Sequence, residues 1–573
     1  MTLLEMCGIM EDERVAMWVA IQYYFNVLCV EGWKMILEDK SLCCKDCDTV
    51  FLLTAGEQEF YAEKGFSEPQ RCKTCRTAKR KNINLRKSFA TTYAECNCNN
   101  DLIKLHSKIK EWSVEAKDEE SAYFYNVKEA ELISNGKKSF VIGRKGSGKT
   151  AIARHLIESE HADTFSIPLS FKDFPFEIIY SLSNSKEYTI PNQYVSIWKY
   201  LIYTCVCKKM IENEAIDVDV RSKLSQLYCG NSSVDRLDRL LKKYTTRSFG
   251  VQALSIGFEY ERESCNSEEN WLDTLEVLQG VIFDSCDSSK YFIVIDELDE
   301  ALSSSEEGSN YMDMLTSLFK AVQNIRRTFN NSRKHIYPVV FLRSDIYDRI
   351  RDSDKNKWYE NIINLEWNRI EIQRMLTHRF CVALEQSHIN VEFPAVWYRL
   401  FENKKVSAGN RQSNPMEIYS FIERSTEMRP RDFIQYIKLC VDSSDGVRLI
   451  KPHAVKNADE NFSEYLKRET IDEVFAILPE IDEILGLLST IGKQSFQFST
   501  FEEEYDSLVE RGEVTKRDVR KILLTLFEVG VIGNDLSMRG KTSFKFSGKG
   551  TPRFDYNKTM LVHRGLFKAL QIY

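Results

Sequence analysis

An eight-residue loop from Gly143 to Thr150 carries the clearest chemistry in this chain of 573 residues. It matches the pattern G-x-x-x-x-G-K-[ST], in which loop N–H groups turn towards phosphate oxygens. Gly143, Gly146 and Gly148 allow backbone angles that a Cβ would disfavour. Lys149 adds a positive charge for the outer phosphates, and Thr150 offers a hydroxyl to Mg²⁺. We therefore expect nucleotide contacts from the whole loop: Gly143, Arg144, Lys145, Gly146, Ser147, Gly148, Lys149 and Thr150.

The residues around the loop predict the elements that must position it. Residues 140–143 read as a short buried strand, and residues 151–157 read as a helix whose positive end points at the anion. The order strand, loop and helix predicts an α/β fold in which helices cover a parallel sheet.

Two acids follow a second buried strand. Residues 291–295 are apolar throughout, and Asp296 and Glu297 come directly after them. Because ligands of α/β sheets bind beyond the carboxyl ends of the strands, we expect both acids at the phosphate site. Asp296 is the candidate Mg²⁺ ligand, and Glu297 is the candidate base that deprotonates the attacking water. Simple capping of the strand is the alternative.

A third apolar strand, residues 335–342, ends in Arg343, Ser344 and Asp345. In NTPases with an additional catalytic glutamate, this strand lies between the acid-pair strand and the loop strand, so that its end faces the γ-phosphate. We take Arg343 as the catalytic sensor, with Asp345 as the other candidate. A salt bridge at the strand end is the alternative.

Residues 427–436 offer another arginine. Pro430 suits the first turn of a helix, and Arg429 and Arg431 flank it. The segment resembles the start of the sensor-2 helix of AAA-type ATPases, which implies that one of these arginines reaches the nucleotide. We take Arg431 as that contact; a role at the surface or in the helix cap is the alternative.

Four cysteines have the spacing of a metal site. Cys44 and Cys47 form one C-x-x-C pair, and Cys72 and Cys75 form another. Two such pairs close a tetrahedral site, and four thiolates favour Zn²⁺. Cys43 is an alternative to Cys44, but only Cys44 gives the two-residue spacing. Four protein ligands leave no position for water, so we expect a structural role.

Residues 36–82 resemble a small bacterial zinc-ribbon family. The resemblance rests on both cysteine pairs and on the stretch between them, with Ala-Gly-Glu-Gln at 55–58 and Lys-Gly-Phe at 64–66. It implies the fold and the metal, since the activity of that family is largely undefined.

Residues 71–87 hold eight Lys or Arg and no acid, which makes them a candidate surface for nucleic acid. A solvated ribbon edge is the alternative.

The composition limits the class of protein. The net charge is −7, so any basic surface is local. The 16 cysteines show no disulfide pattern, which indicates a reducing, cytoplasmic location. Residues 15–30 are too short and too polar for a membrane helix and follow acids, so we expect neither a membrane span nor a signal peptide. Residues 1–34 are either native or an upstream extension before Met35.

The motifs divide the chain into five predicted segments: an N-terminal extension at 1–34, a zinc ribbon at 35–88, a P-loop core at 89–345, a helical lid at 346–470 and a winged helix at 471–573. Within the core we also expect a strand at 164–171, helices at 193–213 and 218–243, and a strand or hairpin at 250–262. The winged helix is predicted from helices at 472–491, 499–512 and 515–530, followed by a wing. Its basic cluster fits DNA, whereas other winged helices bind proteins: Arg511, Lys516, Arg517, Arg520 and Lys521.

Residues 105–573 resemble a bacterial P-loop ATPase family related to the AAA and STAND groups. The resemblance rests on the loop, the acid pair, the strand ending Leu-Arg-Ser-Asp, the Arg-Pro-Arg-Asp helix start, and a tail with Val-His-Arg-Gly-Leu. Members are often encoded in anti-phage defence islands. The resemblance therefore implies ATP hydrolysis and favours a role in defence.

The sequence thus predicts a Mg²⁺-dependent ATPase that acts as a nucleotide-driven switch, with ATP, Mg²⁺ and Zn²⁺ as its small ligands. The alternatives are a nucleotide-gated scaffold and an origin-recognition-like DNA-binding ATPase, either with little turnover. A protein partner or a separately encoded effector is expected, because no nuclease, protease or deaminase motif stands out. A homo-oligomer is compatible with the sequence.

Overall fold

The computed structural model describes residues 39–45, 49–63, 68–73, 75–76, 98–159, 163–170, 190–229, 270–298, 308–330, 332–407, 414–446, 448–475, 477–536, 542–546 and 552–572. Several predictions fall outside these ranges: those for residues 1–34, Cys47, and residues 77–87, 230–243 and 250–262. The chain divides into two compact units, Met1–Glu95 and Cys96–Tyr573, and each is described by itself.

The first unit contains a hairpin followed by a helix. Strands β1 (Lys40–Cys43) and β2 (Val50–Leu53) pair antiparallel, and α3 (Ala55–Glu63) comes next. Thr54 and Glu57 form a capping box at the start of α3. The Glu57 N–H donates to Thr54 Oγ1 at 3.3 Å, and the Thr54 N–H donates to Glu57 Oε2 at 3.4 Å. The Ala-Gly-Glu-Gln stretch therefore begins a helix.

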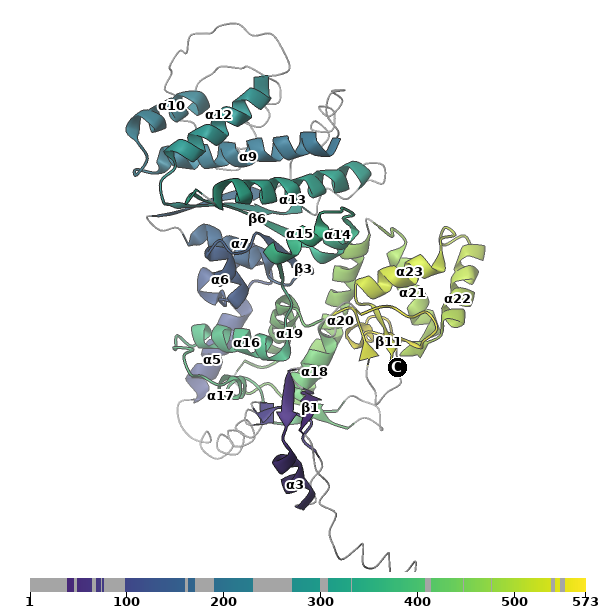
Figure 1. Ribbon diagram of the computed structural model, residues 1–573. Coiled ribbons are helices and arrows are strands. Elements are labelled where there is room, and N and C mark those ends of the chain that lie inside the picture. The colour runs from purple at the N-terminus through teal and green to yellow at the C-terminus, as the bar shows by residue number, and fades with distance from the viewer. Residues whose placement is uncertain are drawn as a thin grey trace, which may run out of the picture. The chain divides into compact units, whose positions relative to one another are not determined.

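Five parallel strands form the centre of the second unit (Figure 1). Their order across the sheet is β4 (Thr164–Ser170), β5 (Lys290–Asp296), β6 (His335–Arg343), β3 (Phe140–Gly143) and β7 (Ile362–Asn364). Strand β6, which comes after the acid pair in the chain, lies between β5, which carries that pair, and β3, which leads into the loop. This order agrees with the prediction. The predicted α/β fold with the sheet of a P-loop NTPase is thereby confirmed.

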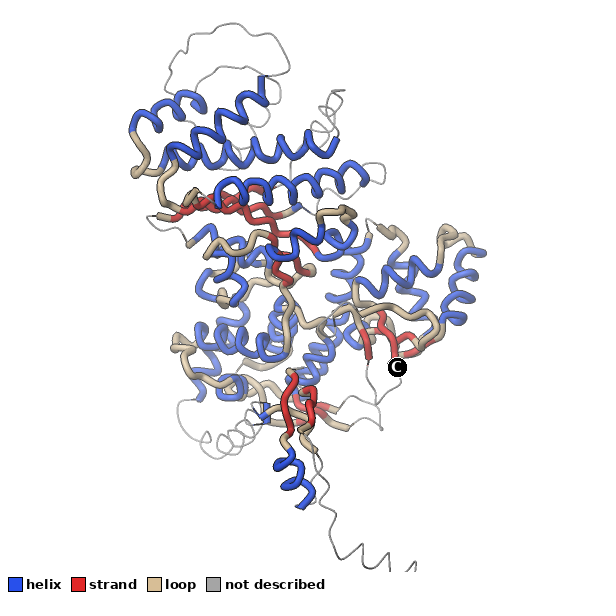
Figure 2. Tube along the Cα trace, viewed as in Figure 1, coloured by secondary structure: helices blue, strands red, loops and turns tan. Residues whose placement is uncertain are grey.

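Side chains of β5 alternate between the two faces of this sheet. Tyr291, Ile293 and Ile295 belong to one apolar cluster, and Phe292 and Val294 belong to another. The first cluster includes side chains of α9 (Ile190–Glu212), α12 (Asn270–Ser285) and α13 (Gly308–Asn330). The second includes side chains of α6 (Lys128–Ser134) and α7 (Lys149–Glu158). Figure 2 shows the strands between these helical layers, which explains why β5 reads as a continuous apolar run.

Further helices flank this core. Those that precede the loop or pack on α9 are α5 (Cys98–Glu111), η2 (Ala116–Asp118), η3 (Ser121–Tyr123) and α10 (Val218–Cys229). Those that follow the sheet are α14 (Ser344–Arg349), α15 (Lys355–Trp358), η5 (Tyr359–Asn361), α16 (Arg369–Ala383), α17 (Phe393–Trp397), α18 (Ile418–Ser425), α19 (Pro430–Asp442) and α20 (Pro452–Val474). A short hairpin joins α17 to α18 through β8 (Lys405–Val406) and β9 (Met416–Glu417). Across the described residues, every helix is too short or too polar to cross a bilayer.

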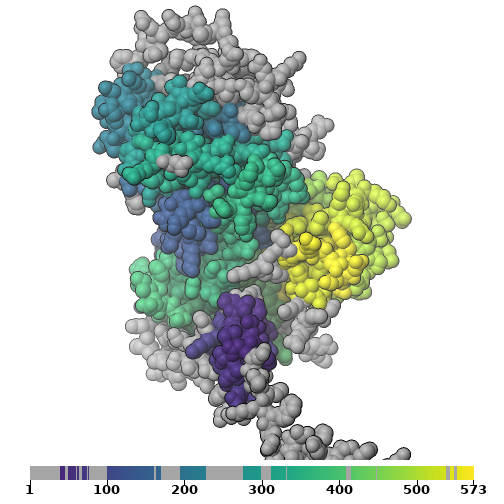
Figure 3. All heavy atoms as spheres, in the orientation of Figure 1, coloured from purple at the N-terminus to yellow at the C-terminus, as the bar shows by residue number. Residues whose placement is uncertain are grey.

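The C-terminal residues combine three helices with a small sheet, seen as the yellow lobe in Figure 3. The helices are α21 (Ile481–Ile491), α22 (Phe498–Glu510) and α23 (Val519–Glu528). The strand order is β10 (Ser495–Phe496), β13 (Met560–Val562), β11 (Ile532–Asp535) and β12 (Thr542–Ser543).

Two predicted helices at this end have the wrong bounds. The helix expected at 472–491 is interrupted between Val474 and Ile481. The helix expected at 515–530 begins only at Val519, because the Asp518 side chain caps it by accepting the Arg520 N–H at 3.0 Å.

The Val-His-Arg-Gly-Leu tail packs against helices α18 and α20. Arg564, which begins η6 (Arg564–Leu566), binds Asp459 at 3.1 and 3.2 Å and also contacts Ser425. Its guanidinium lies over the Phe421 ring, 4.2 Å from the centroid. At Gly565, a Cβ would lie 2.2 Å from the Ser425 carbonyl oxygen, so only glycine fits. This motif is therefore a docking point for the C-terminal lobe.

We predict that Gly565→Ala lowers the thermal unfolding temperature. The added methyl group meets backbone that cannot easily move, which corresponds to a loss of about 1–3 kcal/mol. Gly486→Ala is the matched control, since Gly486 lies inside α21 and its Cβ would have no atom within 4 Å. Alanine should leave stability unchanged there or raise it by up to about 1 kcal/mol. Equal melting temperatures for both variants, measured by differential scanning fluorimetry, would contradict the tight docking at Gly565.

Candidate functional site

The phosphate loop connects β3 to α7. Gly146 and Gly148 have φ of 78° and 97°, which is the left-handed region that glycine tolerates. Gly143 differs from the prediction, because it ends β3 without a positive φ. A Cβ there would lie 2.5 Å from Ser147 Oγ, so glycine is favoured because a side chain would lack space.

Three side chains bind the backbone of the loop, one of them Arg429, whose guanidinium donates to the Lys145 carbonyl oxygen at 3.4 Å. Lys149 Nζ donates to the carbonyl oxygens of Gly143 and Arg144, both at 3.1 Å. The Trp367 indole N–H donates to the Ser147 carbonyl oxygen at 2.8 Å. This role of Trp367 was not predicted; its only signal in the sequence is an aromatic residue shortly after a strand.

The acid pair lies at the carboxyl end of β5. Asp296 is the last residue of the strand, and Glu297 follows with φ of 63°. A left-handed residue with a side chain is uncommon and costs of order 1–3 kcal/mol, and such strain clusters at functional sites. This conformation favours chemistry over simple capping. The Glu297 carboxylate forms an ion pair with Lys117, a contact that the sequence did not predict.

Arg343 lies next to the loop at the same edge of the sheet. In the parallel pairing of β3 and β6, it stands opposite Gly143. Its guanidinium donates to both carboxylate oxygens of Asp345, at 3.0 and 2.9 Å, and to Glu473 Oε1 at 3.3 Å. The strand-end salt bridge that the sequence left open is present, and the sensor role stays a prediction.

Arg429 is buried among carboxylates. It lies 3.0 Å from Asp432, 3.4 Å from Glu427 and 3.9 Å from Glu473. Burial opposes the charge, but these carboxylates hold the pKa of Arg429 well above its ordinary value. Glu427 also binds Arg144 of the loop, and despite burial the two arginines lower the pKa of Glu427. These contacts make Arg429 part of a structural cluster.

Arg431 has a different position from Arg429. It lines the cavity beside the loop, and its Cβ is 3.2 Å from the point that a Cβ of Gly146 would occupy. Its guanidinium pairs with Glu115 at 2.7 Å and with Glu469 at 3.1 Å. Of the two candidate arginines, the structure thus places Arg431 in the cavity.

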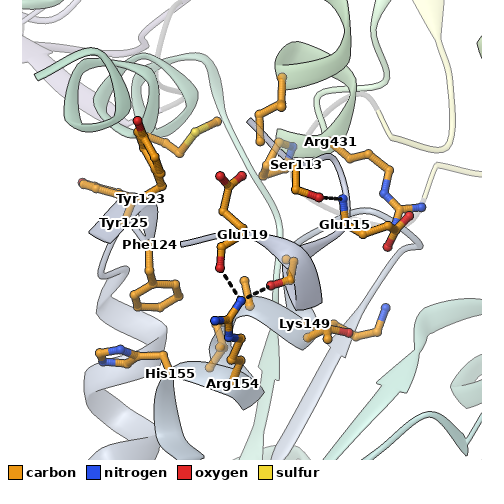
Figure 4. Close-up of a pocket in the computed structure, with 18 of the residues that line it drawn as sticks. Ser113, Glu115, Glu119, Tyr123, Phe124, Tyr125, Lys149, Arg154, His155 and Arg431 are labelled. Carbon is orange, nitrogen blue, oxygen red and sulfur yellow. Dashed lines mark hydrogen bonds and ion pairs between the residues drawn. The ribbon is translucent and has the colours of Figure 1, made fainter. Parts of the chain in front are cut away.

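The cavity has a volume of about 170 Å³ and is bounded by three parts of the second unit. These are the segment 113–127, the loop with α7, and side chains from Trp367, α16 and the start of α19. In Figure 4, Phe124 lies against His155, with ring centroids 4.2 Å apart. Arg154 points at the segment and donates to the carbonyl oxygens of Ala116, Lys117 and Glu119. Lys149 and Thr150 line the same cavity, which is therefore open to a nucleotide bound at the loop.

The cysteine cluster lies in the first unit. The Sγ atoms of Cys44, Cys72 and Cys75 all lie within 4.8 Å of one another. The Cys75 N–H donates to Cys72 Sγ at 3.5 Å. Cys44 is buried and Cys43 is exposed, so Cys44 is the better ligand of the two. The three thiols fit a zinc site, whose predicted fourth ligand, Cys47, lies outside the described residues.

Two parts of the chain match known families. Residues 38–84 match a family described as a probable treble clef domain, and residues 371–470 match one described as a FunZ-associated C-terminal helical domain. The first match agrees with the hairpin, helix and cysteine cluster of the first unit and supports Zn²⁺ there.

The chain is also similar to a transposon gamma-delta 80.3 kDa protein of Escherichia coli (strain K12), with 23% identity over 469 residues. The match covers 75% of this chain, and the chain spans 62% of that relative's length.

Solved structures give weaker likenesses. One is the Aeropyrum pernix ORC1 protein in complex with DNA, at 12% identity and a TM-score of 0.33, covering 78% of this chain and 90% of that one. Another is Cdc6p from Pyrobaculum aerophilum, at 11% identity and 0.27, covering 78% and 96%. A third is Drosophila ORC bound to DNA, at 11% and 0.27, covering 91% and 100%. Scores this low carry no functional argument.

We predict that the purified protein holds about one zinc ion per chain. Cys44→Ser should remove most of this zinc, because a serine hydroxyl is a poor replacement for a thiolate. Cys43→Ser is the matched control, one residue away and exposed, and should keep it. Mass spectrometry of the metal content measures both. Zinc loss from the Cys43 variant instead would reverse the ligand assignment.

Proposed function

We propose that the protein is a Mg²⁺-dependent ATP hydrolase that works as a nucleotide-driven switch. The observation that carries this proposal is the strand order β5, β6, β3, which brings the acid pair, Arg343 and the phosphate loop to one edge of the sheet. Nucleotides bind at this edge in P-loop proteins. The strained backbone at Glu297 adds support for chemistry there.

Each residue then has a defined task. The loop N–H groups and Lys149 bind the phosphates. The Thr150 hydroxyl and the Asp296 carboxylate are hard oxygen donors suited to Mg²⁺, which would neutralise charge on the phosphates. Glu297 takes a proton from the attacking water, and Arg343 responds to the γ-phosphate. Catalysis of this kind depends on positioning and on charge stabilisation.

The switch is supported by the contacts of the loop itself. Arg144 binds Glu427, donates to the Val529 carbonyl oxygen at 3.3 Å, and lies 5.4 Å from the Phe546 ring centroid. Lys145 binds Glu469 at 3.3 Å. A movement of the loop on nucleotide binding would therefore change its contacts with the helical region and with the C-terminal lobe.

We further propose that the C-terminal lobe is a winged helix that binds a protein partner. Three helices and a small antiparallel sheet support the fold. Three of its basic residues are paired with acids: Arg511 binds Glu513 at 2.6 Å, Arg517 binds Glu480 at 3.0 Å, and Lys516 lies 3.7 Å from Asp506. The acids of these pairs place negative charge on the same surface, which weakens its attraction for a DNA backbone and favours a protein partner over DNA. A role in anti-phage defence rests on the family resemblance, and loss of phage resistance in cells carrying Lys149→Ala would support it.

We predict that Glu297→Gln binds ATP at least as tightly as the wild type but loses hydrolysis by at least about a hundredfold, because the amide cannot accept the proton. Lys149→Ala should lose nucleotide binding itself. Phosphate release and fluorescent-nucleotide titration measure the two effects. Hydrolysis at the wild-type rate by Glu297→Gln would remove the base assignment. ATP binding by wild type without any turnover, including with cell extract, would favour the nucleotide-gated scaffold.

Binding of duplex DNA across a salt series decides between a protein partner and an origin-recognition-like function. We expect no tight, ATP-dependent binding at low salt. A steep fall of affinity with salt, together with ATP dependence, would show that DNA is the partner.

A further inference from the structure

The segment 113–120 lies across the cavity and is fixed at both ends. Trp112, directly before it, is fully buried, and Glu119 forms an ion pair with Arg379 at 2.6 Å. Between these points Arg154, four residues after Thr150 in α7, donates to three of its carbonyl oxygens. The backbone of the segment is thus fixed to the helix that begins at the phosphate loop.

Two side chains of this segment carry opposite charges and have opposite partners. Glu115 binds Arg431, the arginine that lines the cavity, at 2.7 Å. Lys117 binds Glu297, the proposed base. Two residues of one short segment therefore pair with Arg431 in α19 and with Glu297 after β5. A bound ATP would use both of these charged groups.

The exposure of these four groups is uneven. Glu115 and Lys117 are 59% and 56% exposed, whereas Arg431 and Glu297 are 15% and 17% exposed. Ion pairs with one exposed partner contribute little to stability, so a ligand with several negative charges can replace them. ATP would compete with Glu115 for Arg431 and would attract Lys117 away from Glu297. A carboxylate that binds a lysine also has fewer lone pairs free to orient the attacking water.

We infer that the segment 113–120 is an autoinhibitory clamp. Glu115 occupies Arg431, and Lys117 occupies Glu297, until ATP releases both. Lys117 and Glu115 are positioning residues, since they act through Glu297 and Arg431. The Lys117 half of this inference rests on the proposed hydrolysis, whereas the Glu115 half requires only nucleotide binding.

Hydrolysis tests the Lys117 half. Lys117→Met removes the charge with little change in shape and should raise the basal ATPase rate about two- to fivefold, the size expected for loss of an exposed ion pair. Lys117→Arg keeps the charge and should keep the wild-type rate. Asp118→Asn is the matched control, an exposed neighbour that does not line the cavity, and should leave the rate unchanged. A lower or unchanged rate for Lys117→Met would overturn this half, a lower rate showing that Lys117 assists the reaction directly.

Binding tests the Glu115 half without turnover. With a non-hydrolysable ATP analogue and ADP as probes, Glu115→Gln should raise the preference for the triphosphate about two- to fivefold, because Glu115 then no longer competes with the γ-phosphate for Arg431. Adding Arg431→Ala should abolish that gain. An unchanged preference, or a gain that persists without Arg431, would overturn the clamp.

The two arms separate the clamp from the proposed function. If no variant hydrolyses ATP but Glu115→Gln changes the preference through Arg431, the hydrolase proposal fails and the clamp holds for nucleotide binding. If Glu297→Gln abolishes turnover but neither clamp variant has its effect, the hydrolase proposal stands and the clamp fails.

Discussion

Buried charge connects the phosphate loop to the rest of the second unit. Arg429 is almost fully buried, and Asp432, Glu427 and Glu473 are its partners. Glu427 also binds Arg144 of the loop, and Glu473 also binds Arg343 at the end of β6. Removal of one partner from such a cluster leaves a buried charge uncompensated, typically at a cost of about 3–5 kcal/mol. The loop, the sheet edge and the helices α19 and α20 are therefore held in one arrangement.

Contacts with acids explain why Arg144 and Lys145 are charged, although the phosphate-binding pattern leaves both positions variable. Arg144 and Lys145 bind acids that come from α20 and from the residues before α19. Charged residues at these positions make the loop part of an interface as well as a phosphate cradle. On the opposite side of the cavity, Arg154 fixes the segment that carries Glu115 and Lys117. A nucleotide that binds at the loop would thus act on two sets of ion pairs, a stronger buried set and a weaker exposed set.

The motifs of the core could be predicted because each combines an unusual local composition with a fixed place in the chain. The place of β6 between β5 and β3 was predicted from the acid pair and the next apolar strand, and it is confirmed. The break between α20 and α21 was missed, because apolar residues continue through it. The contacts of the segment 113–120 were not predicted, because its carbonyl oxygens meet Arg154, and its side chains meet Arg379 and Glu297, only in the folded chain.

By itself, the sequence determined the phosphate loop, the acid pair, the cysteine pairs and the α/β class, because those features depend on neighbours within a few residues. The tertiary structure decided which arginine lines the cavity, placing Arg431 there and Arg429 in a buried cluster. It also decided that Glu297 has a left-handed backbone and that Lys117 binds it across 180 residues. Such pairings depend on how distant segments pack, so they cannot be predicted from the spacing of residues along the chain.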